Sequence, residues 1–212
     1  MSQQTDSAAA GSTVGRPAVA YFAKVPRPGR VKTRLVPPLT PAEAAGLYAA
    51  FLADGVREVA GARTLVYGWP GDELDTLAAH LTPSLELRAQ CGEDLFARME
   101  ACLAELLAEG HRPVLIRNTD SPDLPAARLQ EAIVRCLEGS VVLGPDEGGG
   151  YYLVAMSELH RGVLAPDWTE TRDRAIARGL RVEVLATEPD VDTFDDLLQL
   201  WRRRAAGASE LD

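Results

Sequence analysis

The chain has 212 residues, of which 46% are hydrophobic, and a formal net charge of −9 at pH 7. This length and apolar content are sufficient for one domain with a sizeable core. The acidic balance argues against nucleic acid or an anionic membrane as the main partner, because both are bound through basic surface. Three widely spaced cysteines without metal-type pairing are typical of reduced thiols in a cytoplasmic protein.

The chain divides into two short ends and one long central part. Residues 1–15 are rich in Ser, Gln, Ala and Gly and lack the features of a signal peptide, so we expect a disordered tail. We expect residues 16–206 to form a single domain and residues 207–212 to form a C-terminal tail. No apolar stretch is long enough to span a bilayer, and no membrane partner is predicted.

Strand-like apolar segments alternate with longer segments of helical periodicity. Strands are predicted at residues 18–22, 64–67, 85–88, 113–116, 140–143, 151–155 and 181–185. Helices are predicted from residue 41 onward and at residues 72–80, 94–109, 129–137, 171–178 and 193–204. Such alternation predicts an α/β fold with a mostly parallel, doubly wound sheet.

The first predicted strand leads into a basic loop at residues 22–35 (FAKVPRPGRVKTRL). Loops at the carboxyl ends of parallel strands are where open α/β sheets bind ligands. Arg offers a planar fork to phosphate oxygens and Lys offers a point charge, although a solvated surface loop would have a similar composition. The spacing of a P-loop is absent. We predict that a diphosphate or triphosphate is bound by Lys24, Arg30, Lys32 and Arg34.

Two acidic segments are candidates for a metal site. Asp120 and Asp123 follow the predicted strand at residues 113–116; Asp123 is equally well explained as a helix cap. Asp120 comes earlier, where it can reach a cleft and supply an oxygen ligand to Mg²⁺ or Mn²⁺. Asp190 and Asp192 precede the last predicted helix, and one of them would meet the same cation if the fold brings the segments together.

A Gly-rich turn is predicted at residues 144–153 (GPDEGGGYYL). Consecutive glycines let the backbone approach a ligand closely, so Gly149 and Gly150 are predicted contacts, although a hairpin turn would also contain them. Asp146 and Glu147 precede these glycines. Either acid would serve as a base, bind sugar hydroxyls or be solvated.

These segments, together with residues 90–99 (QCGEDLFARM), resemble the glycosyltransferase-like DUF2064 family of selenodomain-associated or arsenosugar-biosynthesis transferases. That family lies within the nucleotide-diphospho-sugar transferase superfamily. The resemblance spans residues 17–201 and implies a single-domain, GT-A-like (Rossmann-like) α/β/α sandwich of three layers. It implies Asp120, Glu147 and Lys32 as catalytic residues, Arg98 as a nucleotide contact, and Mg²⁺ or Mn²⁺ on Asp120 and Asp192.

Two places depart from the family pattern. Gly148 stands where the family usually has Asp, and an acid is found instead at Asp146. Arg117 and Asn118 stand where the family tends to have an apolar residue and Gly. We expect these two side chains to add charge and bulk beside the phosphate site.

Three functions follow as hypotheses. The first is a metal-dependent glycosyltransferase that transfers from a nucleotide sugar to a small-molecule acceptor. The second is a nucleotidyltransferase of the guanylyl or cytidylyl type, which joins a nucleoside triphosphate to a phosphorylated or phosphonate small molecule and releases pyrophosphate. Segments 32–35 and 190–193, similar to those of 2-phospholactate and phosphoenolpyruvate guanylyltransferases, keep this second hypothesis open. The third is a non-catalytic nucleotide-binding module, and a homodimer stays open in each case.

Overall fold

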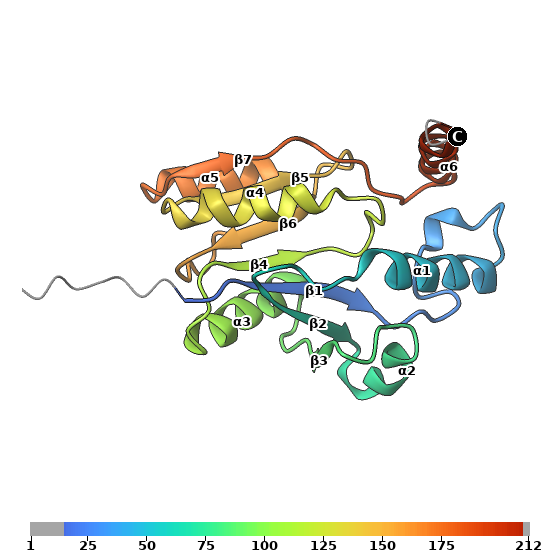
Figure 1. The fold of residues 1–212 in the computed structure, drawn as a ribbon, viewed down its shortest axis with the longest axis horizontal. Helices are drawn as coiled ribbons and strands as arrows, with labels where there is room; N and C mark the ends of the chain where they lie inside the picture. Colours follow the sequence, from blue (N-terminus) through green and yellow to red (C-terminus); the bar gives the residue numbers. More distant parts are fainter. Residues whose placement is uncertain (1–14, 210–212) are drawn as a thin grey trace, which may run out of the picture.

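The computed structural model describes residues 15–209, so the predicted N-terminal tail lies almost entirely outside the described residues. Seven strands form one sheet in the order β3-β2-β1-β4-β6-β5-β7 (Figure 1). The strands are β1 (Ala18–Lys24), β2 (Arg63–Trp69), β3 (Glu86–Ala89), β4 (Val114–Arg117), β5 (Val141–Pro145), β6 (Tyr151–Met156) and β7 (Val182–Val184).

The sheet is mostly parallel, as predicted. Only β6 runs antiparallel to its neighbours, β4 and β5, and every other neighbouring pair is parallel. The four strands β1 to β4 therefore end at the same edge of the sheet. Their last residues, Lys24, Trp69, Ala89 and Arg117, bring the following loops together there.

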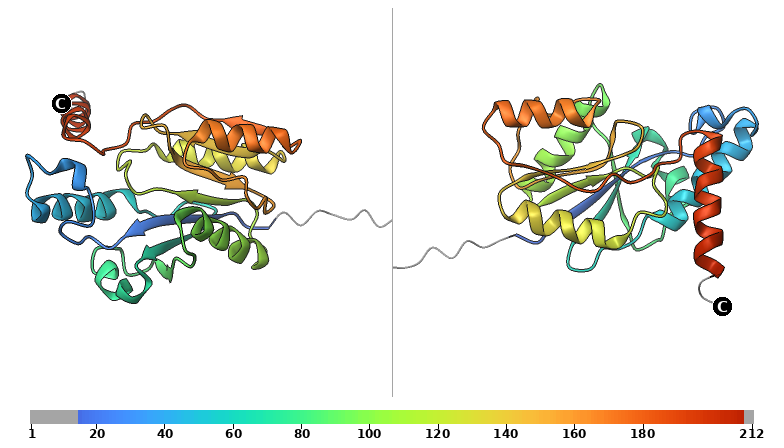
Figure 2. Two further views of the ribbon diagram at one scale, coloured as in Figure 1. Left: turned by 180° about the vertical axis from the view of Figure 1, so that it is seen from behind. Right: turned by 90° about the horizontal axis from the view of Figure 1, so that it is seen from above.

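Helices cover both faces of the sheet, which confirms the predicted three-layer α/β/α architecture (Figure 2). The apolar cluster on one face includes side chains of α1 (Pro41–Gly55) and α4 (Ala126–Leu137), and the cluster on the other includes those of α3 (Leu95–Ala108) and α5 (Trp168–Ala177). The remaining helices are α2 (Leu74–Ala78), α6 (Phe194–Ser209) and two short 3-10 turns, η1 (Thr33–Leu35) and η2 (Gly71–Glu73). Within residues 15–209, no helix has both the length and the apolarity needed to cross a bilayer.

The central strand β1 shows why this sequence forms a buried strand. Its side chains alternate between the two apolar clusters: Val19 and Tyr21 pack on the α1 side, and Ala18 and Ala20 pack on the α3 side. A parallel strand covered on both faces is expected to have such a continuous apolar sequence. The strand stays apolar until Lys24, where it reaches the open edge of the sheet.

The last helix begins with a reciprocal cap. The backbone N–H of Thr193 donates to Asp196 Oδ2 (2.6 Å), and the backbone N–H of Asp196 donates to Thr193 Oγ1 (3.3 Å). These two bonds cap the helix at Thr193 and fix where the chain turns into α6. The helix continues to Ser209 and so includes the first residues of the predicted C-terminal tail.

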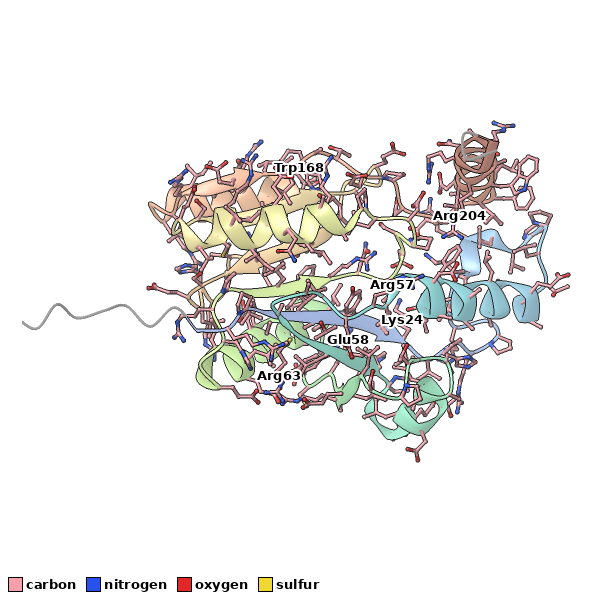
Figure 3. All side chains as sticks on the ribbon, viewed as in Figure 1. Lys24, Arg57, Glu58, Arg63, Trp168 and Arg204 are labelled. Atoms are coloured by element: carbon pink, nitrogen blue, oxygen red, sulfur yellow. The ribbon has the colours of Figure 1, made fainter. Side chains whose placement is uncertain are left out.

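Two ion pairs attach α6 to the rest of the domain. Arg204, labelled in Figure 3, donates to Asp54 on α1 (3.0 Å), and Arg203 donates to Asp123 in the loop after β4 (3.2 Å). Asp123 therefore pairs with a helix instead of capping α4, whose N-cap residue is Pro125 and has no side-chain cap. These contacts hold the segment before α6 beside the loop that carries Asp120.

A pair of glycines tests the packing of this fold. A Cβ atom on Gly144 in β5 would lie 2.4 Å from the buried ring of Tyr152, whereas one on the exposed Gly46 in α1 would meet nothing within 4 Å. We expect Gly144→Ala to destabilise the protein by about 1–3 kcal/mol through overpacking. Gly46→Ala should stabilise it by about 0.5–1 kcal/mol, because Ala is the better helix former. Urea unfolding measures both, and equal midpoints for the two variants would contradict this packing.

Candidate active site

A pocket of about 350 Å³ opens where β1, β2, β3 and β4 end. It is lined by the ends of β1 and β2, the basic loop, the first turn of α3, the loop after β4, and Asp192 from the segment before α6. All five predicted phosphate ligands with a cationic side chain line it: Lys24, Arg30, Lys32, Arg34 and Arg98. The two predicted metal ligands, Asp120 and Asp192, line the same pocket.

Lys32 joins the two predicted metal ligands. Its ammonium Nζ forms a salt bridge with the carboxylate of Asp120 and another with Asp192 Oδ1 at 3.3 Å. The Lys32 side chain is only 4% exposed, whereas the two carboxylates are 39% and 43% exposed. Arg34 adds a second cation, with its Nη1 3.1 Å from Asp192 Oδ2. The fold thus brings Asp120 and Asp192 to one point, as the metal-site hypothesis requires.

A backbone contact explains why these two acidic segments meet. The N–H of Val191 donates to the carbonyl oxygen of Asp120 at 3.0 Å. Val191 itself is fully buried in the core, so the segment cannot drift away without losing apolar burial. The position of Asp192 beside Asp120 therefore rests on a hydrogen bond and on core packing as well as on Lys32.

Tyr48 supports the ends of β1 and β4 from α1. Its hydroxyl is 2.7 Å from Thr119 Oγ1 and accepts a hydrogen bond from the backbone N–H of Lys24 at 3.0 Å. Thr119 in turn donates to the carbonyl of Phe22 at 3.2 Å. Burial, and then the charge of Asp120, raise the pKa of Tyr48 far above its usual value, so the phenol stays neutral. Tyr48 was not predicted as a site residue; the sequence placed it only in a segment of helical periodicity.

Arg98 lies at the opposite end of the pocket, where two neighbouring side chains hold its guanidinium in place. The guanidinium of Arg98 lies 4.4 Å from the centre of the Trp69 ring, and its Nε donates to Gln90 Oε1 at 3.1 Å. Gln90 is buried and donates to the carbonyl oxygens of Tyr67 (2.8 Å) and Ala23 (3.3 Å). Sequence reasoning missed Trp69 and Gln90, although Gln90 opens the 90–99 motif and Trp69 follows a predicted strand.

Three of the pocket cations have no carboxylate partner in the part of the chain that the structure describes. No ion pair is found within residues 15–209 for Lys24, Arg30 or Arg98, whereas the neighbouring Arg27 pairs with Glu73 at 2.5 Å. Figure 3 shows Lys24 where β1 reaches the edge of the sheet. Unpaired cations that line one pocket favour an anionic ligand, because a ligand supplies the charge that the protein lacks there.

The Gly-rich turn lies outside the pocket lining. Gly149 has a φ of 91° in the turn between β5 and β6, and a Cβ atom on Gly150 would lie 2.9 Å from Asp146 Oδ2. Glycine at 150 therefore makes room for a carboxylate of the same turn. Glu147 is exposed, and it does not line the pocket either. The structure does not bring Glu147, Gly149 or Gly150 together with the phosphate-binding candidates.

Two more carboxylates, those of Asp146 and Asp190, interact electrostatically with the group of charges at Lys32. Burial raises the pKa of Asp146, and the charges of Asp192 and Asp120 add to this effect. Burial, followed by the charges of Asp146 and Asp192, raises the pKa of Asp190 to about 6. Hydrogen bonds from the backbone of Gly150 and Gly148 act on the pKa of Asp146 in the opposite direction and lower it.

The expectation for Arg117 was wrong. Its side chain is 3% exposed and does not line the pocket, because it donates to the carbonyl oxygens of Gly55 (2.8 Å) and Ser121 (2.7 Å). The guanidinium lies 5.1 Å from the centre of the Tyr21 ring, and burial lowers its pKa. Arg117 thus joins the end of α1 to the loop that holds Asp120. Asn118 does line the pocket.

The carboxylates fit a divalent cation that is shared with substrate. Mg²⁺ at nucleotide sites is usually held by one or two carboxylates, with phosphate oxygens and water as the other ligands. Asp120 and Asp192 supply two such groups, and both already contact one positively charged atom, Lys32 Nζ. No group of three or more His, Cys, Asp and Glu side chains within residues 15–209 forms a metal cage without substrate.

Known proteins were compared with this chain by sequence and by structure. The profile of a family described as "Uncharacterized protein conserved in bacteria (DUF2064)" matches residues 52–168, more than half of the chain. A structure from Desulfovibrio desulfuricans G20, provisionally described as a nucleotide-diphospho-sugar transferase, is 30% identical with a TM-score of 0.81. The match covers 89% of this chain and 87% of that one. Among curated proteins, none matches this chain at a significant level.

More distant structures share the fold. Rv0371c from Mycobacterium tuberculosis H37Rv, solved in complex with manganese, has a TM-score of 0.54 at 16% identity, with 87% of this chain and 97% of that chain covered. CMP:2-keto-3-deoxy-manno-octonic acid synthetase, solved in complex with CTP, has a TM-score of 0.53 at 13% identity, with 92% and 99% covered. Together with the first structure, these matches confirm the predicted fold class.

The hydrogen bonds of Arg117 generate a stability prediction. Arg117→Leu leaves the carbonyl oxygens of Gly55 and Ser121 without their donors, and we expect a loss of about 1–3 kcal/mol in the free energy of unfolding. Arg202→Leu, on the exposed surface of α6, is the matched control and should change this free energy by less than about 0.5 kcal/mol. Urea unfolding measures both values; an Arg117 variant as stable as the control would show that these bonds contribute little.

Proposed function

The chain belongs to the DUF2064 family, as its motifs predicted, and on this basis we propose that it is a metal-dependent transferase whose donor is activated by a nucleotide. The observation that carries the proposal is the meeting of Asp120 and Asp192 at Lys32 Nζ, inside a pocket with three cations that have no ion pair among the described residues. Such a pocket supplies both parts of a phosphate site: fixed positive charge, and carboxylates for a cation.

The proposed roles follow from position. Asp120 and Asp192 hold Mg²⁺ or Mn²⁺, which when bound neutralises phosphate charge and stabilises a leaving phosphate group. The phosphate chain is bound by Lys24, Arg30, Lys32, Arg34 and Arg98. Gln90 and Trp69 fix the direction of Arg98, so that one cation of this set is oriented before the ligand arrives.

We propose a nucleotide sugar as the donor and a small molecule as the acceptor. In this reaction an acceptor oxygen bonds to the anomeric carbon, the bond from that carbon to the diphosphate breaks, and a nucleoside diphosphate leaves. Support comes from the 30% identity to the Desulfovibrio protein over most of both chains. The pocket volume of about 350 Å³ is within the range of small-molecule sites.

A second candidate is nucleotidyl transfer, which the charge of the pocket favours. Five cationic side chains and two carboxylates line it, an excess of three positive charges. A nucleoside triphosphate carries more negative charge than the diphosphate of a nucleotide sugar and would match this excess better. An acceptor phosphate would then attack the α-phosphorus, and pyrophosphate would leave.

The metal site is tested by nucleotide binding. We expect Asp120→Ala and Asp192→Ala each to weaken Mn²⁺-dependent binding of nucleotides at least about tenfold, because each removes a carboxylate ligand. Asp123→Asn is the matched control, since Asp123 pairs with Arg203 outside the pocket. Titration calorimetry with UDP, GDP and CTP, with and without Mn²⁺, measures the affinities. If both alanine variants bind as the wild type does, the assigned metal site is wrong.

The leaving group separates the two reactions. Incubation of the wild-type protein with Mn²⁺ and a panel of nucleotide sugars should release a nucleoside diphosphate, detected by chromatography. Pyrophosphate release from nucleoside triphosphates with a phosphorylated acceptor would instead support the second candidate. Tight nucleotide binding with neither product would support a non-catalytic binding module.

A further inference from the structure

Lys32 and the proposed cation depend on the same two carboxylates. The ammonium Nζ of Lys32 forms salt bridges with Asp120 and Asp192, which are also the proposed ligands of the cation. Two positive charges that share a pair of carboxylates repel each other strongly at such short range. Lys32 Nζ and a cation held by both carboxylates therefore exclude each other.

The charges around Lys32 are already balanced. Asp120 and Asp192 supply two negative groups, and Lys32 supplies one positive group between them. Arg34 supplies the second positive group, with its Nη1 3.1 Å from Asp192 Oδ2. A neutral group of side chains attracts a divalent cation far less than two free carboxylates do. A cation therefore gains both carboxylates only when Nζ has left them.

Lys32 needs an anion wherever its ammonium lies. Its side chain is 4% exposed, and a charge so far from water is costly without a partner. Among residues 15–209, Asp120 and Asp192 are the only acidic residues that line the pocket. The described part of the chain thus offers no second carboxylate there for Nζ. An anionic ligand in the pocket is the partner that can replace the two it has.

The backbone of Lys32 is fixed, whereas its side chain is long. Val31 before it is 4% exposed, Leu35 is fully buried, and the N–H of Leu35 donates to the carbonyl of Lys32 at 3.0 Å. Lys32 has a left-handed backbone, with φ 46° and ψ 40°, which a residue other than glycine keeps only where its surroundings enforce it. The four-carbon stem of lysine is flexible, so Nζ can turn within the pocket that Lys32 lines while the main chain stays in place.

We propose that Lys32 exchanges its partners when a substrate binds. Its ammonium holds Asp120 and Asp192 until phosphate enters the pocket, and then moves onto the phosphate and leaves both carboxylates to the cation. This inference rests on the proposed metal-dependent function. Charge-assisted hydrogen bonds to phosphate oxygens replace the two salt bridges that Lys32 gives up, and no covalent bond changes.

The exchange couples the binding of cation and phosphate. A phosphate that takes the ammonium of Lys32 frees the two carboxylates, and a cation on the carboxylates releases the ammonium toward the phosphate. Each ligand then strengthens the binding of the other by the same factor. Because Lys32 gives up two carboxylates, a diphosphate or triphosphate replaces them better than a monophosphate does. The exchange therefore selects nucleotides with at least two phosphates.

The experiment compares four proteins: wild type, Lys32→Met, Lys24→Met, and the double variant Lys32→Met with Asp120→Ala. Methionine keeps an unbranched side chain of similar length without the charge. Lys24→Met is the matched control, because it removes the same charge from the same pocket, yet Lys24 has no ion pair among the described residues. Electron paramagnetic resonance measures free Mn²⁺ during titrations, first without nucleotide, and urea unfolding reports whether each variant is folded.

Without nucleotide, we expect Lys32→Met to bind Mn²⁺ at least about tenfold more tightly than the wild type, because nothing then competes for the carboxylates. Lys24→Met should gain less than about threefold, since it acts only through screened space. The double variant should lose the gain, which places the bound ion at Asp120.

A second set of titrations adds nucleotides, with the Mn²⁺ held by nucleotide alone measured in the absence of protein. We expect UDP, GDP or CDP to tighten Mn²⁺ binding to the wild type at least about tenfold, and the matching monophosphates to do so less. This effect of the diphosphate should shrink in Lys32→Met, whose carboxylates are free from the start. Equal effects of monophosphate and diphosphate would contradict the proposed ligand class.

The outcomes separate this inference from the proposed function. If diphosphates promote Mn²⁺ binding to the wild type, but Lys32→Met gains no more affinity for Mn²⁺ alone than Lys24→Met does, the exchange is wrong and the metal site stands. Gained affinity that persists in the double variant would also contradict the exchange. If Mn²⁺ binds neither to the wild type with nucleotides nor to Lys32→Met, the metal-dependent function and this inference are both contradicted.

Discussion

One ammonium group between two carboxylates is the contact on which the rest of the site depends. Lys32 is almost fully buried, and a buried charge is tolerated only when it is paired. Its partners come from the loop after β4 and from the segment before α6, so three distant parts of the chain meet at Nζ. Removing either carboxylate would leave Lys32 with one partner fewer and would also remove a proposed cation ligand. The stability of this edge of the sheet is therefore linked to the proposed binding of the cation.

The elements and the basic loop could be predicted because they depend on local patterns. Strand ends of a parallel sheet share an edge, so loops after strands were expected to meet there, and Asp120 and Lys32 do so. The direction of a side chain on a short strand was harder to predict. Arg117 has the guanidinium group that a phosphate ligand would use, yet this group donates hydrogen bonds to the carbonyl oxygens of Gly55 and Ser121. No local sequence pattern reveals the direction of this side chain. Trp69 and Gln90 act through Arg98, so their importance became visible only with the distances between them.

The charges along the open edge are separated locally, although the protein as a whole is acidic. Cations that have no ion pair among residues 15–209 line the pocket together with Asp120 and Asp192, and a further carboxylate, that of Asp146, lies in the turn after β5. The local separation matters more than the net charge of −9, because fields inside a cleft are weakly screened compared with those at the surface. The order of the strands produces this separation: β1 and β5 are on opposite sides of β4 and β6.

Helix α6 attaches the Asp192 side of the pocket to the domain through contacts at the protein surface. These contacts are weaker than the buried packing around the rest of the site. Asp192 comes just before this helix, which is attached by exposed ion pairs from Arg203 and Arg204 and by the buried Leu200. Exposed ion pairs are worth less than about 1 kcal/mol each and weaken as salt is added. Asp192 is therefore fastened to an element that ionic strength can loosen, while Asp120 lies in the loop directly after β4, a fully buried strand.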